Sequence, residues 1–527
     1  MLHVRILFSS ARRTSCRAHS WRSFAQVQQS RTISNDELAI SYYGQFASYG
    51  DMIKDAKSKA RRSVLIDNCG IDSIYLKEEL WGDIERLYRI RKQTNRIVKK
   101  LSLIEFKSEE SANDLVQRAM HNEGWLPIPL KVLRYNQRFR QATTENQQFP
   151  FPTIDVVLSQ GQEVSPNIDK ITDLISNNMM SLVALKLRFI TLVNIEDAVC
   201  SGLFKEYELI PFGSSVIDTG YDSSDLDLVF HRRSHEQQRD FFYNELVHLD
   251  KSVYSDYRDS TGTKSAMDYI SLLLREFLPL ADGPSVMSLH RARVPIIKFT
   301  SRVTDIDCDM SFNLGIEAHR ANNGGILMTE VMYRLCRRNN LIAAILIYLK
   351  VFARLTGITS KEPNVAMTNF QFQATILYFL QLESIVPPLK EVMTSSDTSI
   401  ILGESDINIK LPELIIRFAR FYSKFDFANL AINLNEGKVE RKRDNSALYI
   451  IYPFETNRNI CQNVPRKGLD HFKKRVDLLR EDPVHIIKLL LDALNKRKKA
   501  TRHVKLEDPY TAQRGHSPEE IAEEVCR

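Results

Sequence analysis

A short turn rich in glycine and serine, followed closely by two aspartates, constrains this chain more than any other feature. The turn reads Pro-Phe-Gly-Ser-Ser over residues 211–215, and nine residues later Asp225 and Asp227 flank a single leucine. Side chains at i and i+2 of a strand point to the same face, so both carboxylates are expected on one face. Two like charges placed together are costly unless a cation lies between them. The pattern therefore predicts a strand that carries a metal site.

The residue types in this segment indicate which ligands it would bind. Carboxylate oxygens suit Mg²⁺ or Mn²⁺, and Mg²⁺ keeps several waters and shares phosphate oxygens. Gly213 lets the backbone approach a phosphate closely, and Ser214 and Ser215 offer hydroxyl and N–H donors. We predict that this turn, from Phe212 onward, binds the triphosphate of a nucleotide beside the metal-binding carboxylates. A solvent-exposed turn before an edge strand is the alternative that the pattern leaves open.

A second group of aspartates supplies candidates for the third carboxylate that two-metal transfer usually needs. Residues 292–299 read as a mostly apolar strand, and Asp305, Asp307 and Asp309 follow it, alternating with apolar residues. All three could share one face, so spacing alone does not choose among them. Asp305 is expected in a hairpin turn. One of the three would bind metal and help to deprotonate an acceptor hydroxyl.

Several motifs follow one another along the chain, in this order: Gly-Ser-Ser, Ser-Asp-Leu-Asp-Leu, Ala-Arg-Val-Pro-Ile-Ile-Lys-Phe, Asp-Met-Ser-Phe-Asn and Tyr-Pro-Phe-Glu-Thr-Asn-Arg-Asn-Ile. In this order they resemble the poly(A) and terminal uridylyl polymerases of the DNA polymerase beta superfamily, and its mitochondrial poly(A) polymerases in particular. The resemblance covers roughly residues 165–480. It implies template-independent addition of nucleotides to an RNA 3′ end.

The resemblance also implies roles for residues near the phosphates. Asp309 matches the third metal ligand and joins Asp225 and Asp227 as a catalytic residue, which makes Asp307 a bystander. Lys350 and Arg354 match a basic pair that reaches the phosphates; four residues apart, they share one face of a helix. A solvated helix face would be the default interpretation of that pair without the resemblance.

Two further positions bear on the choice of base. Phe370 replaces a tyrosine that stacks on the incoming base in the family, so the ring is kept and the hydroxyl is lost. Arg458 stands where uridylyl-selective relatives often carry a histidine, which favours ATP as the substrate. Without the resemblance, Phe370 would be assigned to the core and Arg458 to the rim of a site.

The expected fold class is α/β (α+β), with a nucleotidyltransferase palm built on a mixed sheet and a largely helical central domain. The nucleotide is expected in the cleft between these two domains. The predicted boundaries are 1–40 for a mitochondrial transit peptide, 60–125 for an N-terminal RRM-like (ferredoxin-like) domain, 135–165 for a linker, 166–195 and 325–490 for the helical domain, 196–324 for the catalytic domain, and 491–527 for a basic, disordered tail.

The first 35 residues have the composition of a mitochondrial transit peptide. They contain six Arg, no Lys, no acidic residue and many Ser, and the first carboxylate is Asp36. This pattern favours import into the mitochondrial matrix; a disordered basic tail is the alternative. The whole chain has a net charge of +7, so the remainder is close to neutral once six Arg are removed. Contact with RNA must therefore depend on local basic patches.

Residues 60–125 predict a small RRM-like domain. Strands are expected at 63–66 and 101–106, a helix at 76–87, and a second helix capped by Ser108. The aromatic rings with which RNA-recognition motifs stack on bases are missing, since leucines occupy positions 101 and 103. The domain is therefore expected to bind protein, and the family resemblance implies a homodimer formed through it.

The sequence predicts no membrane span, because the longest uninterrupted apolar run, 341–349, has nine residues. Seven scattered cysteines without a Cys-x-x-Cys motif suit reduced thiols and no zinc site.

We expect transfer of AMP from ATP to RNA 3′-hydroxyls with release of pyrophosphate, in the presence of Mg²⁺ or Mn²⁺. Mitochondrial mRNA is the expected acceptor, with tRNA as a second candidate. The alternatives are a terminal uridylyltransferase, a tRNA CCA-adding enzyme and an inactive RNA-binding scaffold.

Overall fold

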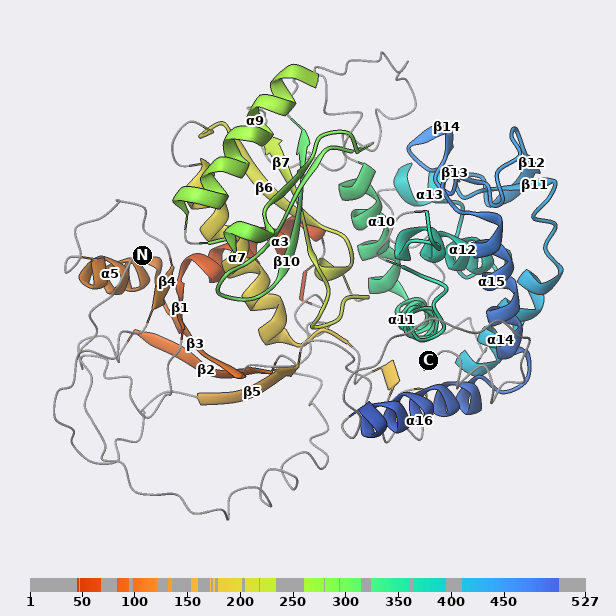
Figure 1. Ribbon diagram of the computed structural model, residues 1–527, viewed down its shortest axis with the longest axis horizontal. Helices are drawn as coiled ribbons and strands as arrows, with labels where there is room; N and C mark the ends of the chain where they lie inside the picture. The colour runs from red at the N-terminus through yellow and green to blue at the C-terminus, as the bar shows by residue number, and fades with distance from the viewer. Residues whose placement is uncertain are drawn as a thin grey trace. The chain divides into compact units, whose positions relative to one another are not determined.

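The computed structural model describes two compact units (Figure 1). The first holds most residues up to 330 and the second those from 331 onward, together with 163–179 and 246–250. The described residues are 45–67 (not 47), 83–93, 98–120, 131–134, 153–159, 171–200 (not 172–173 and 176–178), 204–233 (not 218), 260–313 (not 279 and 293), 324–394 (not 361–363) and 410–501. The transit peptide predicted over 1–40 lies outside them.

The N-terminal part of the first unit is a five-stranded sheet with the order β4-β1-β3-β2-β5. Strand β3 pairs antiparallel with β1 and β2, whereas β4 and β5 add in parallel at the two edges. Both strands predicted here are present. The elements are α3 (Tyr49–Arg61), β1 (Ser63–Asp67), β2 (Ile84–Gln93), β3 (Val98–Phe106), α5 (Glu109–Met120), β4 (Val132–Arg134) and β5 (Thr153–Ser159).

Two predictions about this region are wrong. The helix expected over 76–87 is contradicted at its end, because residues 84–87 belong to β2; residues 76–82 lie outside the described part. The linker expected over 135–165 contains β5, which pairs with β2 over seven residues. The strand itself is apolar, with Ile154, Val156, Val157 and Leu158, but it is short and follows a Gln-, Asn- and Pro-rich stretch that set the character of the whole segment. The cap predicted for the second helix is present, because Ser111 N–H donates to Ser108 Oγ.

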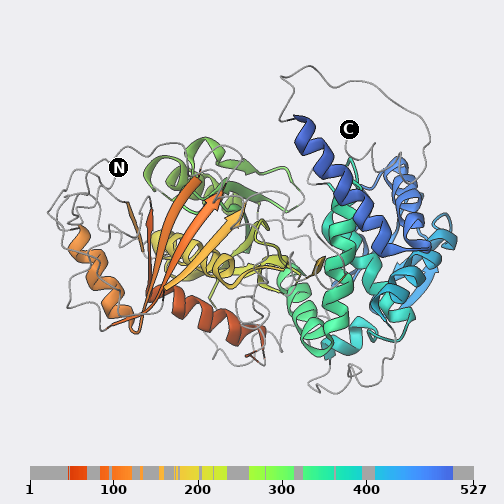
Figure 2. The same ribbon diagram turned by 90° about the horizontal axis from the view of Figure 1, so that it is seen from below.

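Helix α7 (Leu182–Cys200) covers one face of this sheet (Figure 2). Leu65 and Leu103 are paired across β1 and β3, and Leu103 lines a small cavity together with Leu185 and Phe189 of α7. This is the face on which an RNA-recognition motif would carry its stacking rings. Leucines occupy positions 101 and 103, and Tyr88 of β2, which is opposite Leu103, is 1% exposed with Lys186 of α7 over its ring. Burial therefore closes this face to base stacking.

The palm is a second five-stranded sheet with the order β6-β7-β10-β9-β8. Strand β10 pairs parallel with β7, and the other pairings are antiparallel, which gives the mixed sheet that the sequence predicted. Strand β7 is buried on both faces, as a central strand requires. The elements are β6 (Tyr207–Phe212), η3 (Ser214–Val216), β7 (Leu226–Arg232), α9 (Ser260–Leu272), η5 (Leu273–Phe277), η6 (Gly283–Ser285), β8 (Met287–Leu289), β9 (Ile296–Thr300) and β10 (Asp307–Asn313).

The second unit is mostly helical and contains a small sheet with the order β12-β11-β13-β14. Asn339 caps α11, and Thr368 with Gln371 forms a capping box that starts α12. Rings from three helices pack in its core, among them Phe418, Tyr422 and Phe472. The elements are α10 (Gly324–Arg338, which begins in the first unit), α11 (Asn340–Leu355), α12 (Asn369–Leu382), α13 (Leu389–Thr394), α14 (Leu411–Lys424), β11 (Leu430–Asn433), β12 (Lys438–Arg441), β13 (Ile450–Tyr452), β14 (Glu455–Asn459), α15 (Arg466–Asp477), η9 (Leu478–Arg480) and α16 (Pro483–Thr501).

The structure confirms the α/β fold class and modifies three of its expected parts. The segment 166–195, predicted to belong to the helical domain, is divided, because residues 180–195 belong to the first unit, where α7 packs on the N-terminal sheet. The helical domain predicted over 325–490 includes the small sheet, and the tail predicted over 491–527 begins inside α16, which continues to Thr501. Residues 502–527 lie outside the described part. Within the described residues, no helix is long and apolar enough to cross a bilayer.

Lys92 of β2 is buried where the N-terminal sheet meets the palm. Its Nζ donates to the carbonyl of Thr304, in the turn between β9 and β10. Burial lowers the pKa of Lys92 from 10.5 to about 8, against the opposing attraction of Asp305. Between these two pH values the unfolded chain binds more protons than the folded one, so this group makes folding more favourable as pH rises.

We therefore expect the free energy of unfolding of the wild-type chain, relative to that of Lys92→Met, to increase as the pH rises from 8 to 10.5. The gain should reach at most roughly 3 kcal/mol, the equivalent of the pKa shift. Urea denaturation at a series of pH values measures it, with Lys100→Met, an exposed neighbour, as the matched control. Parallel curves for the wild type and Lys92→Met would show that Lys92 is not desolvated.

Candidate active site

The Gly-Ser turn predicted from the sequence lies at the end of β6 and against Asp227. Gly213 has φ +79° and ψ −164°, a conformation that is essentially restricted to glycine. A Cβ atom at this position would lie 2.5 Å from Asp227 Oδ2. Gly213 N–H donates to Thr329 Oγ1 of α10 at 2.8 Å, and Ser214 and Ser215 follow in the short helix η3. The turn thus brings its backbone into direct contact with a predicted metal ligand.

A buried arginine holds the loop between the turn and the two aspartates. Arg188 of α7 is 1% exposed, and its guanidinium donates to the carbonyls of Asp222, at 2.7 Å, and Ser224. The Asp222 carboxylate accepts Ser181 N–H at 2.7 Å, and burial raises the pKa of Asp222. Sequence reasoning missed this support. An arginine inside the apolar stretch of α7 is the signal that could have indicated it.

The strand register brings Asp227 and Asp309 together. Asp227 of β7 is paired with Asp309 of β10 on one side and with Phe212 of β6 on the other. Asp225 comes directly before β7. The turn and the carboxylates therefore meet in one part of the palm sheet.

The three aspartates that spacing could not separate have different surroundings. Asp305 lies in the β9–β10 turn with φ +49° and accepts Lys99 Nζ at 3.1 Å. Asp307 is exposed and accepts Thr300 Oγ1 at 2.9 Å. Asp309 is the member of the three that is in register with Asp227. This placement favours Asp309 as the third carboxylate.

Lys298 of β9 is a further residue of this site that the sequence did not single out. Its Nζ lies 2.7 Å from Asp309 Oδ2, across the antiparallel β9–β10 pair. The cation offsets part of the repulsion among the carboxylates. Its position in the Ile-Ile-Lys-Phe strand, opposite an aspartate, is visible only once the register is known.

The donor set fits Mg²⁺ that shares its ligands with a substrate. Among the described residues, no three His, Cys, Asp or Glu side chains are grouped closely enough to hold a metal ion by themselves. Mg²⁺ usually takes one or two carboxylates and completes its shell with water and substrate phosphates. Asp227 and Asp309, with Asp225 beside them, supply such a partial shell, whereas a closed structural metal cage is not formed.

The remaining predicted residues belong to the second unit. Lys350 and Arg354 lie one turn apart on α11, and both are half-buried. Phe370 starts α12 with 36% of its surface exposed, and its ring centroid lies 6.4 Å from that of Tyr452 in an edge-on arrangement. The Arg458 guanidinium lies over the Tyr452 ring at 4.7 Å. The structure thus joins Phe370 and Arg458 through Tyr452, which the sequence had not marked as a site residue.

A mixed sheet with a Gly-Ser turn at one strand end, and with aspartates paired on two adjacent parallel strands, is the arrangement that a nucleotidyltransferase palm requires. Comparison with known proteins narrows this class. The family described as "Poly(A) RNA polymerase, mitochondrial-like, central palm domain" matches residues 168–332.

Two relatives that align with more than half of the chain carry a similar name. The Drosophila melanogaster protein "Poly(A) RNA polymerase, mitochondrial" is 28% identical over 332 residues, which cover 58% of this chain and 52% of that protein. Its Homo sapiens namesake is 26% identical over 412 residues, 72% of this chain and 67% of that protein. The chain thus spans about half to two thirds of the length of these relatives. Its predicted resemblance to the mitochondrial poly(A) polymerases is confirmed.

A solved structure gives the same result for the fold. The crystal structure titled "mtPAP in complex with GTP" matches with a TM-score of 0.65, covering 86% of this chain and 96% of that one. At 22% identity the match shows a shared fold.

Gly213→Ala tests the contact between the turn and Asp227. The substitution adds backbone strain of about 1–3 kcal/mol and drives a methyl group into the carboxylate. We expect binding of a non-hydrolysable ATP analogue with Mg²⁺, followed by calorimetry, to weaken at least about tenfold.

Gly437→Ala is the matched control. Gly437 also has a positive φ, +59°, but a Cβ there meets only ordinary contacts, the nearest at 3.4 Å from Pro388. It should lose stability without losing nucleotide affinity. Equal nucleotide affinity in both variants would contradict the assigned role of the turn.

Proposed function

We propose that the chain is a template-independent RNA 3′-adenylyltransferase that adds AMP from ATP to an RNA 3′-hydroxyl and releases pyrophosphate. The observation that carries the proposal is the contact of the Gly213 turn with Asp227, which is itself in register with Asp309. For this reaction a nucleotide triphosphate has to lie beside two carboxylates. The turn would bind the triphosphate, and the strands β7 and β10 carry the carboxylates. The names of the relatives support RNA as the acceptor and adenylate as the group transferred.

The reaction forms one bond and breaks one. The RNA 3′-oxygen bonds to the α-phosphorus of ATP as the bond from that phosphorus to the β-phosphate oxygen breaks, and pyrophosphate leaves with the electron pair. Asp309 accepts the proton of the 3′-hydroxyl, and the Gly213 turn and the half-buried Ser214 hold the triphosphate. Ser215, predicted to do the same, is 0% exposed, so its hydroxyl is assigned no contact with the nucleotide. Mg²⁺ or Mn²⁺, held by Asp225, Asp227 and Asp309, would supply Lewis-acid stabilisation of the charge on the phosphates. Lys350 and Arg354 are proposed to bind phosphate oxygens as well.

The base is proposed to stack on Phe370. An exposed ring at the start of a helix, next to Tyr452, is suited to stacking, and stacking accepts any base. Arg458 is held over Tyr452 by a cation–π contact, and a positively charged planar group there replaces the histidine of uridylyl-selective relatives. Preference for ATP over UTP is therefore assigned to this cluster.

The remaining assignments concern partners and location. We propose mitochondrial RNA 3′ ends as substrates and the mitochondrial matrix as the compartment, from the relatives' names and the basic, acid-free N-terminus. A homodimer is proposed through the N-terminal domain of residues 60–125. Light scattering of the chain with and without this domain measures that assembly.

Extension of a labelled oligo(A) RNA, with each NTP in turn and Mg²⁺, tests the reaction. Long products are expected with ATP, and Asp309→Asn should lower the rate at least about a thousandfold, because it removes a metal ligand and the proton acceptor together. Asp307→Asn is the matched control, since this neighbouring aspartate is exposed and binds Thr300. Its rate should stay within about threefold of the wild type.

Three outcomes would contradict the proposal in different ways. Preference for UTP would retain the mechanism and replace the substrate. Equal activity of Asp309→Asn and the wild type would remove Asp309 from the site. No extension with any NTP, by a folded chain that binds RNA, would establish an inactive scaffold.

Phe370 is tested by a pair of substitutions. Phe370→Leu should raise the KM for ATP about tenfold, because loss of base stacking costs about 1–3 kcal/mol. Phe370→Tyr keeps the ring and should remain close to the wild type. Steady-state kinetics over a range of ATP concentrations measures both, and an unchanged KM in Phe370→Leu would place the base elsewhere.

A further inference from the structure

The N-terminal elements contact the palm at two turns, and each turn leads into one half of the proposed catalytic site. Helix α3 meets the end of β6, which continues into the Gly213 turn. The β2–β3 hairpin meets the turn between β9 and β10, which continues into Asp309. In both places the contact is made to backbone carbonyls of the turn or strand, so it fixes where the backbone lies.

The first contact comes from Tyr49, which is fully buried at the start of α3. Its hydroxyl donates to the carbonyl of Pro211, two residues before Gly213. Pro211 and Phe212 are the last residues of β6, so this hydrogen bond lies at the base of the triphosphate-binding turn.

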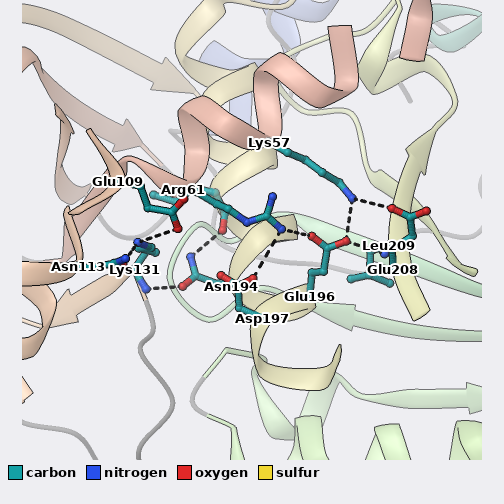
Figure 3. A network of polar contacts seen from close by, with 11 residues as sticks. Lys57, Arg61, Glu109, Asn113, Lys131, Asn194, Glu196, Asp197, Glu208 and Leu209 are labelled. Carbon is teal, nitrogen blue, oxygen red and sulfur yellow. Dashed lines mark hydrogen bonds and ion pairs between the residues drawn. The ribbon is translucent and has the colours of Figure 1, made fainter. Parts of the chain in front are cut away.

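A buried ion-pair network holds α3 in place for that contact (Figure 3). Glu196 of α7 accepts Lys57 Nζ and Arg61 Nη2, each at 2.7 Å, and also accepts the N–H of Leu209 in β6 at 2.9 Å. Burial alone would raise the pKa of Glu196, but Lys57, Leu209 and Arg61 lower it, so the carboxylate stays charged. One buried carboxylate thus ties α3, α7 and β6 together.

The second contact comes from two lysines of the hairpin. Lys92 Nζ donates to the carbonyl of Thr304, and Lys99 Nζ donates to the carbonyl of Arg302 at 2.9 Å and to Asp305 Oδ1 at 3.1 Å. Asp305 has a positive φ, which is uncommon for a residue other than glycine. The lysines therefore satisfy the carbonyls of a strained turn four residues before Asp309.

We propose that the N-terminal part of the first unit, from α3 to β5, is a positioning part of the catalytic site, acting through Tyr49 on the Gly213 turn and through Lys92 and Lys99 on the strand of Asp309. Catalytic groups have to be held within about 0.5 Å of their productive positions, and surrounding hydrogen bonds supply that restraint. The sheet face that would stack on RNA bases is covered by α7, so this face is not available to RNA. The inference rests on the proposed function for the identity of the ligand, but the restraint itself is a property of the fold.

Two variants and two matched controls test this positioning in the full-length chain. Tyr49→Phe removes the hydroxyl that reaches Pro211, and Lys99→Met removes the cation that reaches Arg302 and Asp305. Tyr422→Phe removes an equally buried hydroxyl, which donates to Thr375 in the second unit at 2.7 Å. Lys100→Met removes the exposed neighbour of Lys99.

Three readouts are compared: amide hydrogen exchange of peptides covering 211–216 and 300–309, affinity for Mg²⁺ with a non-hydrolysable ATP analogue, and affinity for oligo(A) RNA. The kcat for RNA extension and the KM for ATP are measured in addition. Tyr49→Phe should speed exchange in 211–216 and weaken nucleotide binding by roughly five- to tenfold, the scale of one net hydrogen bond. Lys99→Met should speed exchange in 300–309 and lower kcat by a similar factor with KM for ATP nearly unchanged. RNA affinity should not change in either variant, and both controls should match the wild type in all three readouts.

Unchanged exchange and unchanged nucleotide affinity in both variants would overturn the inference, and so would effects of equal size in the controls. A loss of RNA affinity alone would assign the domain to RNA binding instead, and would also overturn it. A wild-type chain that binds nucleotide but extends no RNA would refute the proposed function, while the exchange data would still decide the positioning role. Lys92→Met is a further variant of the same contact. If it unfolds the chain, Lys92→Arg, which keeps the cation, should show wild-type exchange rates and a wild-type kcat.

Discussion

The parallel pairing of β7 with β10 is the constraint on which the rest of the site depends. It places Asp309 opposite Asp227 and leaves the β6 side of β7 for the turn at Gly213. Carboxylates on adjacent central strands repel one another, and the apolar residues of the same strands keep water from screening them on the core side. The sheet can hold this arrangement because Lys298 lies against Asp309 and because a divalent cation and a triphosphate are suited to complete it.

Buried charged residues of α7 and β2 support this arrangement. Arg188 fixes the loop before Asp225, Glu196 joins α7 to β6 and α3, and Lys92 caps the turn before Asp309. These groups are buried. Arg188 and Glu196 are each stabilised by several hydrogen bonds, whereas burial disfavours the charged form of Lys92 and lowers its pKa. Removing one partner should therefore displace a catalytic segment as well as lower stability. The N-terminal sheet contributes to this support, since the sheet face that carries Leu103 packs against α7, the helix of Arg188 and Glu196.

Local patterns were sufficient to predict much of the site. The Gly-Ser turn, the strand with Asp225 and Asp227, the capped helix after Ser108 and the basic pair on one helix all depend on neighbours within a few residues. The choice among Asp305, Asp307 and Asp309 depended on strand register, which spacing does not encode, so it came from family resemblance and is supported by the pairing with Asp227. Tyr49, Arg188, Lys298 and Tyr452 escaped notice because their contacts are made by the fold and no local pattern encodes them. The strand β5 was mistaken for linker because seven mostly apolar residues are set beside a longer polar and Pro-rich stretch.

The most direct test of the central claim is to locate the metal. Crystals of the chain grown with Mn²⁺ and a non-hydrolysable ATP analogue would show, by anomalous scattering, where the ion binds. The account predicts Mn²⁺ beside Asp225, Asp227 and Asp309, with the triphosphate against the Gly213 turn. Bound nucleotide with Mn²⁺ away from these carboxylates, or with the triphosphate away from the Gly213 turn, would contradict it.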